Sequence, residues 1–248
     1  MNPSVPVVLL HGWGLNPAVW QPWSAHLARP LVSLALPGHG GAPWSGQRTL
    51  AEWAARALEQ APPRAVWLGW SLGGLVVLQA ALLAPARVVA MVLLASTPRF
   101  VQADDWPAAM PAEVLAAFHT DLTRAPADTL HRFLVLQTRG ASAARDTLRR
   151  LRADLSVAPP PDPDALAVGL ELLRASDLRA ALPAIAVPTL WLCGARDTLV
   201  PAAVAPAVAR LMPASRQQVL PDAGHAPWLA QPVATAAAVV AFLAEHAA

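Results

Sequence analysis

The chain has 248 residues, of which 55% are hydrophobic, so it can bury the core of one large domain or of one domain that carries an insertion. No apolar run reaches the roughly 18 residues of a membrane span, and no charged segment precedes a long apolar one at the start, so we expect neither a membrane anchor nor a secretion signal. A single cysteine, Cys193, excludes an internal disulfide and favours a cytoplasmic protein.

The positive charge is concentrated in one segment. All 18 basic residues are arginine, and without lysine or tyrosine the net charge stays near +2 over several pH units. The high isoelectric point that follows does not indicate nucleic-acid binding. Residues 124–152 hold seven arginines against two acidic residues, whereas the rest of the chain holds 11 arginines against 14 acidic residues.

Six short runs rich in β-branched residues or leucine predict strands at 5–10, 31–36, 65–69, 88–95, 189–194 and 217–220. The runs are nearly continuous in apolar residues, which is typical of parallel strands covered on both faces. Helical patterns lie between them at 50–60, 73–84, 202–211 and 233–245. This order predicts an α/β fold, with a mostly parallel doubly wound sheet and helices on both faces.

The alternation of strands and helices stops between about residues 97 and 187. Helical patterns occur there at 112–123, 127–138, 142–155 and 163–175, and a proline-rich run separates the last two. We expect residues 98–186 to form a helical cap, inserted into a core of residues 1–97 and 187–248. No internal repeat interrupts this organisation.

A nucleophile motif follows the third predicted strand. The sequence Gly69-Trp70-Ser71-Leu72-Gly73 fits the pattern G-x-S-x-G, and a helical pattern begins directly after it. A serine on such a tight strand-to-helix turn has its hydroxyl lifted above the sheet, and only small residues fit on either side of the turn. Strand, motif and helix together predict Ser71 as the nucleophile of a hydrolase.

A serine nucleophile needs a base, and the base needs an acid that orients it. Asp197 and His225 each follow a predicted strand, at the sheet edge where catalytic groups collect, and they come in the chain order Ser, Asp, His that this kind of fold uses. Asp222 is the competing acid. Because it lies only three residues before His225, we expect it to shape the loop and predict Asp197 as the acid.

The loop after the first strand, His11-Gly12-Trp13-Gly14, is placed to supply one backbone N–H of an oxyanion hole, and the residue after the nucleophile supplies the other. We therefore predict the N–H groups of Trp13 and Leu72 as donors. His11 and His39 precede glycine turns, so we expect structural roles for both. The remaining histidines lack metal-ligand spacing, and we predict no metal and no cofactor.

The motifs identify the chain as a member of the α/β-hydrolase superfamily, and five collinear segments resemble one of its families. These segments are 11–16, 67–76, 132–140, 169–179 and 223–227. They resemble the pimeloyl-[acyl-carrier protein] methyl ester carboxylesterases of biotin biosynthesis. The resemblance implies hydrolysis of that methyl ester to methanol and pimeloyl-[acyl-carrier protein], and an acyl-carrier protein with a phosphopantetheine arm as the partner of a monomeric enzyme.

By the family's pattern, the substrate contacts fall on a defined set of residues: Trp13, Ser71, Leu72, Phe133, Leu134, Val135, Leu136, Gln137 and His225. The spacing of Leu130, Phe133, Leu134 and Gln137 places these four on one helix face, either as a pocket wall or as ordinary core packing.

Arg132, Arg145 and Arg149 align with basic positions of the family's carrier-docking surface, although Asp128 stands where the family has another arginine. Arginine suits an acidic carrier protein and its phosphate. The alternative is a helix face that is merely solvated.

Three rival functions remain open at this point. The first two are enzymes of the same fold, a broad-specificity short-chain carboxylesterase and a C–C bond hydrolase. The third is a ligand receptor on a hydrolase scaffold, in which the triad binds a signal. Dehalogenases and epoxide hydrolases of this fold are disfavoured because they use an aspartate at the position of Ser71.

Overall fold

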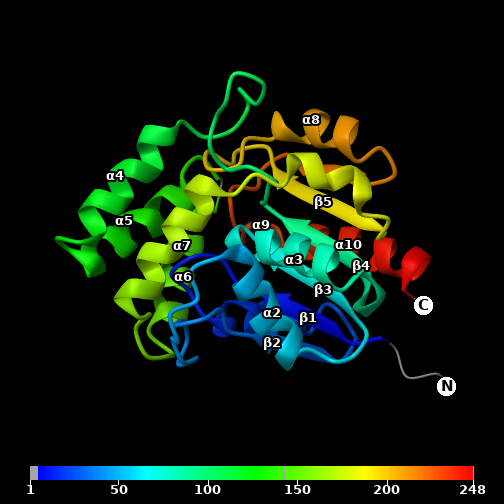
Figure 1. Ribbon diagram of the computed structural model, residues 1–248, viewed down its shortest axis with the longest axis horizontal. Coiled ribbons are helices and arrows are strands. Elements are labelled where there is room, and N and C mark those ends of the chain that lie inside the picture. The colour runs from blue at the N-terminus through cyan, green and yellow to red at the C-terminus, as the bar shows by residue number, and fades with distance from the viewer. Residues whose placement is uncertain (1–4, 142, 248) are drawn as a thin grey trace.

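The structure is a computed structural model, and it describes residues 5–141 and 143–247. Six strands form one parallel sheet in the order β2-β1-β3-β4-β5-β6 (Figure 1). Their bounds are β1 Val7–Leu10, β2 Leu31–Leu34, β3 Ala65–Trp70, β4 Val88–Leu94, β5 Thr189–Gly194 and β6 Arg216–Leu220. The predicted fold class is confirmed, and each predicted strand is present.

Helices cover both faces of the sheet. The longer ones are α2 Leu50–Gln60, α3 Leu72–Leu83, α8 Val204–Leu211 and α10 Pro232–His246. The short helical segments are η1 Pro17–Trp20, α1 Gln21–Ser24, η2 Pro85–Arg87, η3 Arg179–Ala184 and α9 Pro227–Ala230. In Figure 1, α2 and α3 lie in front of the strands and α10 lies behind them.

Alternate side chains of β1 belong to different layers of the core. Val8 and Leu10 pack with residues of α2 and α3, whereas Val7 and Leu9 pack with residues of α10 such as Phe242. Side chains of successive strand residues point to opposite faces, and here both faces are covered. This is why the strands are apolar throughout rather than alternating with polar residues.

Besides η3, the described residues between β4 and β5 form four α-helices, which we call the cap helices. They are α4 Ala112–Leu122, α5 Pro126–Thr138, α6 Ala144–Leu155 and α7 Pro163–Ala175. They stand together at the left of Figure 1, beside the sheet. The predicted start of the third cap helix, Ser142, lies outside the described residues. The cap limits of 98–186 stay a prediction.

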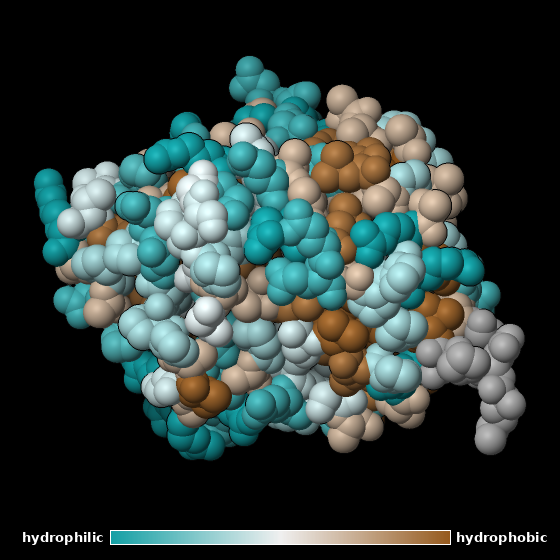
Figure 2. Space-filling view, turned by 60° about the horizontal axis from the view of Figure 1, so that its bottom comes forward, coloured by the Kyte–Doolittle hydropathy of each residue, from teal (hydrophilic) through white to brown (hydrophobic). Residues whose placement is uncertain are grey.

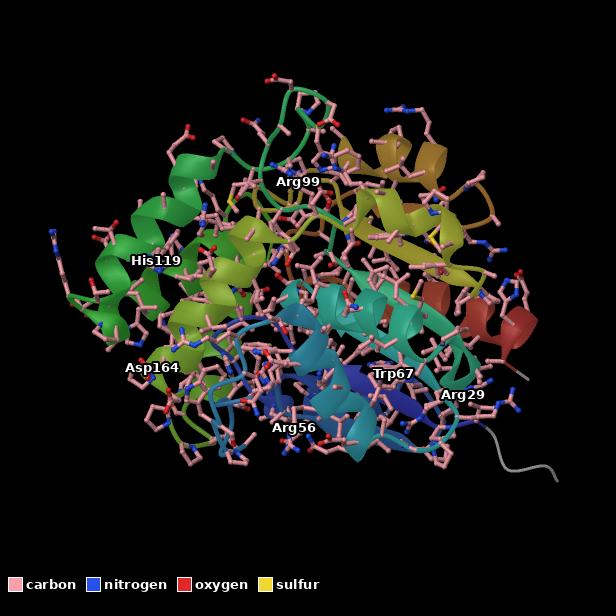
Figure 3. The ribbon with its side chains drawn as sticks, in the orientation of Figure 1. Arg29, Arg56, Trp67, Arg99, His119 and Asp164 are labelled. Atoms are coloured by element: carbon pink, nitrogen blue, oxygen red, sulfur yellow. The ribbon has the colours of Figure 1, made fainter. Side chains whose placement is uncertain are left out.

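The two connections to the cap helices are tied to each other near Arg99 (Figure 3). The Arg99 guanidinium donates to Asp177, with Nη1 2.8 Å from Oδ2, and Arg179 binds both Asp177 and Asp105 at 2.8 Å. The backbone N–H of Leu178 donates to the carbonyl of Pro98 at 2.9 Å. These arginines hold the pKa of the Asp177 carboxyl well below its usual range. The chain therefore leaves and rejoins the core at neighbouring points.

No helix within residues 5–141 and 143–247 is both long enough and apolar enough to cross a membrane.

Candidate active site

Ser71 occupies a strained turn between β3 and α3. Its backbone has φ 55° and ψ −119°, a region that residues other than glycine rarely adopt. Three hydrogen bonds hold it there: Ser71 N–H donates to Leu94 O at 3.0 Å, and Ser71 O accepts from Gly74 N–H at 2.9 Å and from Ser96 Oγ at 2.8 Å. The turn is thus fixed by the neighbouring strand β4 and by the first turn of α3.

The glycines on either side of the turn are required by close backbone contacts. A Cβ atom on Gly69 would lie 2.4 Å from Gly73 O, and one on Gly73 would lie 2.5 Å from His11 O. Neither distance is tolerable, and both neighbours are backbone atoms that have no flexible end to move. The structure therefore gives a physical reason for both glycines of the G-x-S-x-G motif.

Asp197, rather than Asp222, is the acid that contacts His225. Asp197 Oδ2 accepts a hydrogen bond from His225 Nδ1 at 2.8 Å, and its Oδ1 accepts from the N–H groups of Leu199 and Val200 at 2.8 and 3.0 Å. Both partners of the pair are buried. Asp222 forms an ion pair with Arg196 at 3.0 Å instead. The backbone donors orient the Asp197 carboxylate so that its second oxygen faces the imidazole.

The other nitrogen of His225 is available for proton transfer. His225 Nε2 is buried and makes no hydrogen bond within the described part of the chain. The residue before Ser71 fixes the histidine loop, because Trp70 Nε1 donates to His225 O at 2.7 Å and the two rings lie 5.7 Å apart. Catalytic hydrogen bonds often tighten only when substrate is bound, so the free nitrogen suits a base that serves Ser71.

The predicted oxyanion loop lies directly against the turn of Ser71. A Cβ atom on Gly12 would be 3.3 Å from Ser71 Cβ and 3.1 Å from the Trp70 ring, so the loop 11–14 passes over the turn. Leu72 is the first residue of α3, where a backbone N–H has no partner inside the helix. The structure thus brings the two segments with the predicted donors, Trp13 and Leu72, to the same place.

His11 and His39 are buried structural residues. His11 Nε2 accepts from the Leu36 N–H at 3.1 Å and Nδ1 lies 2.8 Å from Gly12 O, so the backbone engages both ring nitrogens. His39 Nδ1 lies 2.8 Å from Pro37 O. Burial, the largest cause in each case, lowers the pKa of His11 to about 3 and that of His39 to about 4. Both are therefore neutral in the folded protein near pH 7.

We expect these two histidines to make the fold acid-sensitive. In the unfolded chain, the two histidines bind protons near pH 6.5, whereas in the folded protein they do so only well below pH 5. The free energy of unfolding is therefore at its full value above pH 6.5 and falls as the pH drops below it. Each histidine should remove about 2 kcal/mol by pH 5. Urea unfolding of the wild type and of His11→Gln at pH 7 and pH 5 measures this, because glutamine keeps an acceptor for Leu36 but does not titrate. Equal pH dependence in both proteins would contradict it.

The apolar face of α5 lies against the oxyanion loop and the histidine loop. Leu130, Phe133, Leu134 and Gln137 are all buried. The Phe133 ring meets the Trp13 ring edge-on at 4.8 Å, and the carbonyl of Gln137 accepts from the His225 N–H at 3.3 Å. Leu136 is half-buried, whereas Val135 lies on the solvent side of the helix, 47% exposed. The predicted substrate residues 133–137 therefore divide between two faces.

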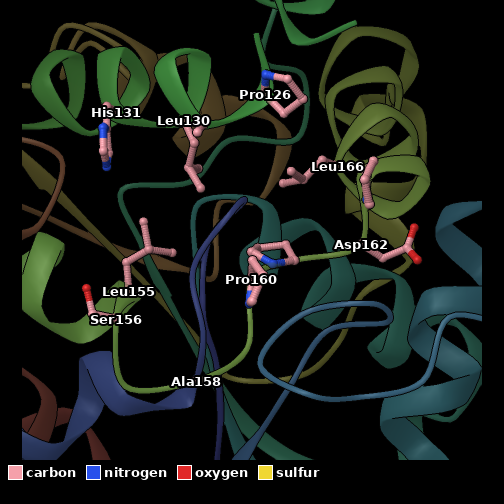
Figure 4. Close-up of a pocket in the computed structure, with 12 residues that line it drawn as sticks. Pro126, Leu130, His131, Leu155, Ser156, Ala158, Pro160, Asp162 and Leu166 are labelled. Carbon is pink, nitrogen blue, oxygen red and sulfur yellow. The ribbon is translucent and has the colours of Figure 1, made fainter.

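A cavity of about 550 Å³ lies beside this face, between the cap helices (Figure 4). It is lined mostly by apolar residues: Pro126, Ala127, Leu130, His131, Leu155, Ser156, Ala158, Pro160, Pro161, Asp162, Pro163 and Leu166. A Cβ atom on Gly14 would lie 2.3 Å from Leu130 and 3.7 Å from Leu166. Two leucines of the cavity wall therefore also pack on the oxyanion loop.

The three arginines predicted to dock a carrier protein are exposed on α5 and α6. Arg132 pairs with Asp121 and Arg149 with Asp146, both at 2.9 Å. Exposed pairs of this kind are weak, so both guanidinium groups can exchange partners at little cost. Among the described residues, no group of three histidine, cysteine or acidic side chains is arranged to hold a metal ion.

The sequence did not predict the contacts that Leu166 and Gly169 of α7 make with Trp13. The Leu166 carbonyl accepts from Trp13 Nε1 at 2.8 Å, and Gly169 faces the same indole. The glycine inside a helical pattern was the available signal, because such a glycine usually has a packing reason. Ser96, which binds Ser71 O, follows a buried strand and had no distinguishing signal.

A family model described as the alpha/beta hydrolase fold matches residues 5–230. The chain therefore belongs to the α/β-hydrolase fold family. Among curated proteins, it is 46% identical over 230 residues to a pimeloyl-[acyl-carrier protein] methyl ester esterase of Klebsiella pneumoniae (strain 342), a match that covers 92% of this chain and 89% of the relative. The same protein of a second K. pneumoniae strain, ATCC 700721 / MGH 78578, is also 46% identical over 230 residues, with the same coverage.

Solved structures show the same fold. An esterase from Exiguobacterium antarcticum superposes with a TM-score of 0.85 at 21% identity and covers 98% of this chain and 93% of its own. A hydrolase from Pseudomonas aeruginosa PA01 superposes with a TM-score of 0.80 at 28% identity, covering 98% and 91%.

Proposed function

We propose that the protein is a serine carboxylesterase that hydrolyses the methyl ester of pimeloyl-[acyl-carrier protein]. The products are methanol and pimeloyl-[acyl-carrier protein], and the reaction is a step of biotin biosynthesis. The observation that supports the chemistry is the buried Asp197–His225 pair beside the strained turn of Ser71. The 46% identity to the K. pneumoniae esterases over most of the chain supports the substrate.

In the first half-reaction, Ser71 Oγ attacks the methyl ester carbonyl and His225 Nε2 takes its proton. The Asp197 carboxylate, 2.8 Å from Nδ1, holds the imidazole and stabilises its charged form. The N–H groups of Trp13 and Leu72 bind the oxyanion; such a donor contributes about 3 kcal/mol at the transition state. The intermediate then expels methanol, which leaves with the proton of His225.

In the second half-reaction, water replaces methanol and the same groups act again. His225 takes a proton from the water as it attacks the pimeloyl ester of Ser71. The second oxyanion collapses, Ser71 Oγ recovers its proton from His225, and the free carboxylic acid leaves and ionises by giving its proton to water. No cofactor is needed for either half.

The substrate also contains a thioester, which has to survive. We propose that the carrier protein docks on the outer side of α5 and α6, so that the length of the acyl chain brings the distal methyl ester to Ser71 and keeps the thioester outside. Arg132, Arg145 and Arg149 are exposed there, in the segment with the excess of positive charge. Figure 2 shows hydrophilic side chains over much of the cap side of the molecule, at its left.

Charge reversal at the docking surface tests this partner. We expect Arg145→Glu with Arg149→Glu to raise KM for the carrier-bound ester about tenfold or more, because an acidic carrier is repelled and steered less well. A short p-nitrophenyl ester should be hydrolysed as before. Arg56→Glu, a reversal on α2 of the core (Figure 3), is the matched control. Equal losses on both substrates, or the same loss with the control, would contradict the docking proposal.

The function itself is tested with the carrier-bound methyl ester and purified protein. We expect methanol release and a carrier species lighter by one methyl group in the mass spectrum. The gene should also restore growth without biotin to a strain that lacks this step, and Ser71→Ala should not. Hydrolysis of short esters alone would favour a broad-specificity esterase, cleavage of a C–C bond would favour that class of hydrolase, and no turnover above one per minute would favour a receptor.

A further inference from the structure

Gly169 lies inside a helix, and because it has no side chain the Trp13 indole can pack against the helix at this point. It lies in the middle of α7, where glycine is disfavoured because it loses more backbone freedom than any other residue. A Cβ atom here would lie 2.6 Å from Trp13 Cδ1 and 3.0 Å from Trp13 Nε1. Only glycine therefore lets the indole rest against the helix backbone.

The Trp13 side chain is held by two cap helices at once. On α7, the carbonyl of Leu166 accepts the Nε1 hydrogen at 2.8 Å, one turn before Gly169. On α5, the ring of Phe133 packs edge-on at a centroid distance of 4.8 Å and an angle of 68°. The indole is fully buried. A large side chain fixed on three sides leaves the backbone of its own residue little freedom.

Gly169 also lies close to Leu72, the second residue whose backbone N–H is proposed as an oxyanion donor. The Cβ position of Gly169 lies 3.4 Å from Leu72 Cδ2, an ordinary van der Waals contact. The side chains of Trp13 and Leu72 thus converge on Gly169, while their backbone N–H groups belong to the two segments that meet at Ser71. An added methyl group would therefore collide with the Trp13 indole, whereas it would only touch Leu72.

We propose that Gly169 is a positioning residue, which seats the Trp13 indole against α7 and thereby fixes the backbone N–H of Trp13 in the oxyanion hole. The inference rests on the proposed esterase chemistry at Ser71. It gives the cap helices a role beyond covering the substrate, because they hold part of the catalytic machinery in place. Substrates too short to reach the cap should then still depend on Gly169.

The test uses p-nitrophenyl acetate, whose acyl group is too short to fill a pocket between the cap helices. We expect Gly169→Ala to lower kcat about tenfold or more with KM changed less than about twofold, since a single oxyanion donor contributes about 10²–10³ in kcat. Val168→Ile adds one carbon to the same helix and is the matched control, with wild-type kcat. Unchanged kcat in Gly169→Ala, or an effect on KM alone, would overturn the proposal.

A double-mutant comparison separates positioning from general damage to the helix. Trp13→Ala removes the indole that Gly169 accommodates but keeps the backbone N–H. We expect it to lower kcat, and Gly169→Ala added to it to change kcat by less than about twofold further. If Gly169→Ala costs the same factor in both backgrounds, its effect does not pass through Trp13 and the proposal fails.

A second variant keeps the proposal testable if Gly169→Ala does not fold. Trp13→Phe removes the donor to Leu166 O without adding atoms, and we expect it to lower kcat while KM stays unchanged. Wild-type kcat in Trp13→Phe would overturn the proposal. A wild type that hydrolyses the acetate but not the carrier-bound ester would refute the proposed substrate and leave this inference standing. A wild type that neither hydrolyses the acetate nor reacts with a fluorophosphonate would overturn both.

Discussion

Ser71→Ala is expected to lower hydrolysis of the carrier-bound methyl ester by about 10⁴-fold or more, because the nucleophile and with it the acyl-enzyme are lost. The fold should remain, since the Ser71 side chain makes no hydrogen bond to any residue that the structure describes; the contacts that hold the turn are made by the backbone N–H and C=O of Ser71. The measurement is methanol release, together with the melting temperature of the variant.

Ser45→Ala, at an exposed loop position, is the matched control and should have wild-type activity. A fluorophosphonate probe should label the wild type and the control but not Ser71→Ala. Residual activity above about one per cent, with a folded variant, would mean that Ser71 is not the nucleophile.

Asp197→Asn is expected to lower kcat by about 10⁴-fold, as replacement of the orienting acid does in other serine hydrolases. The N–H groups of Leu199 and Val200 both donate to Oδ1, so the amide oxygen of an asparagine takes that place and its NH₂ group faces His225 Nδ1. The imidazole must then carry its proton on Nε2, where it cannot accept one from Ser71. The measurement is kcat for the carrier-bound ester and for a short ester, and both should fall.

Asp222→Asn tests the competing assignment with the same chemical change. Its carboxylate pairs with Arg196 at an exposed position, where an ion pair contributes about 1 kcal/mol or less. We expect kcat within about threefold of the wild type. Comparable losses in both variants would contradict the assignment of Asp197 as the acid.

The sequence predicted the elements well where a local signal marks their ends. The bounds of α2 were predicted correctly, and its first turn has a capping box between Thr49 and Glu52. The bounds of α7 were also predicted correctly, where Asp162 caps the helix and Pro163 occupies its first position.

Two of the errors lie at strand ends, one beside a proline and the other where a distant residue takes the backbone N–H. The first strand was predicted from residue 5 but begins at Val7, after Pro6, which has no N–H for the sheet. The second was predicted to reach residue 36 but ends at Leu34, since the N–H of Leu36 donates to His11 Nε2 instead. That bond joins residues 25 positions apart, so no local pattern contains it.

In the candidate site, too, some features have a local signal in the sequence, whereas others depend on contacts between distant segments. Ser71, Asp197 and His225 could be predicted because each follows a strand of a parallel sheet, and the carboxyl ends of such strands meet at one edge. The support from α5 and α7 could not, because it depends on how the cap helices pack on the loops. The carbonyl of Gln137 that holds the His225 N–H is a backbone group, and every residue type provides one.

The ion pairs of Asp177 with Arg99 and Arg179 have a consequence for how such a protein can diversify. Since the chain leaves and rejoins the core at neighbouring points, a segment of different length or shape can close the same short gap with little change in chain entropy. Substrate preference can thus be altered by exchanging the whole inserted segment while the sheet is kept. The exchange is restricted, because any replacement must again present a backbone against which the Trp13 indole can lie and a carbonyl that accepts from the His225 N–H.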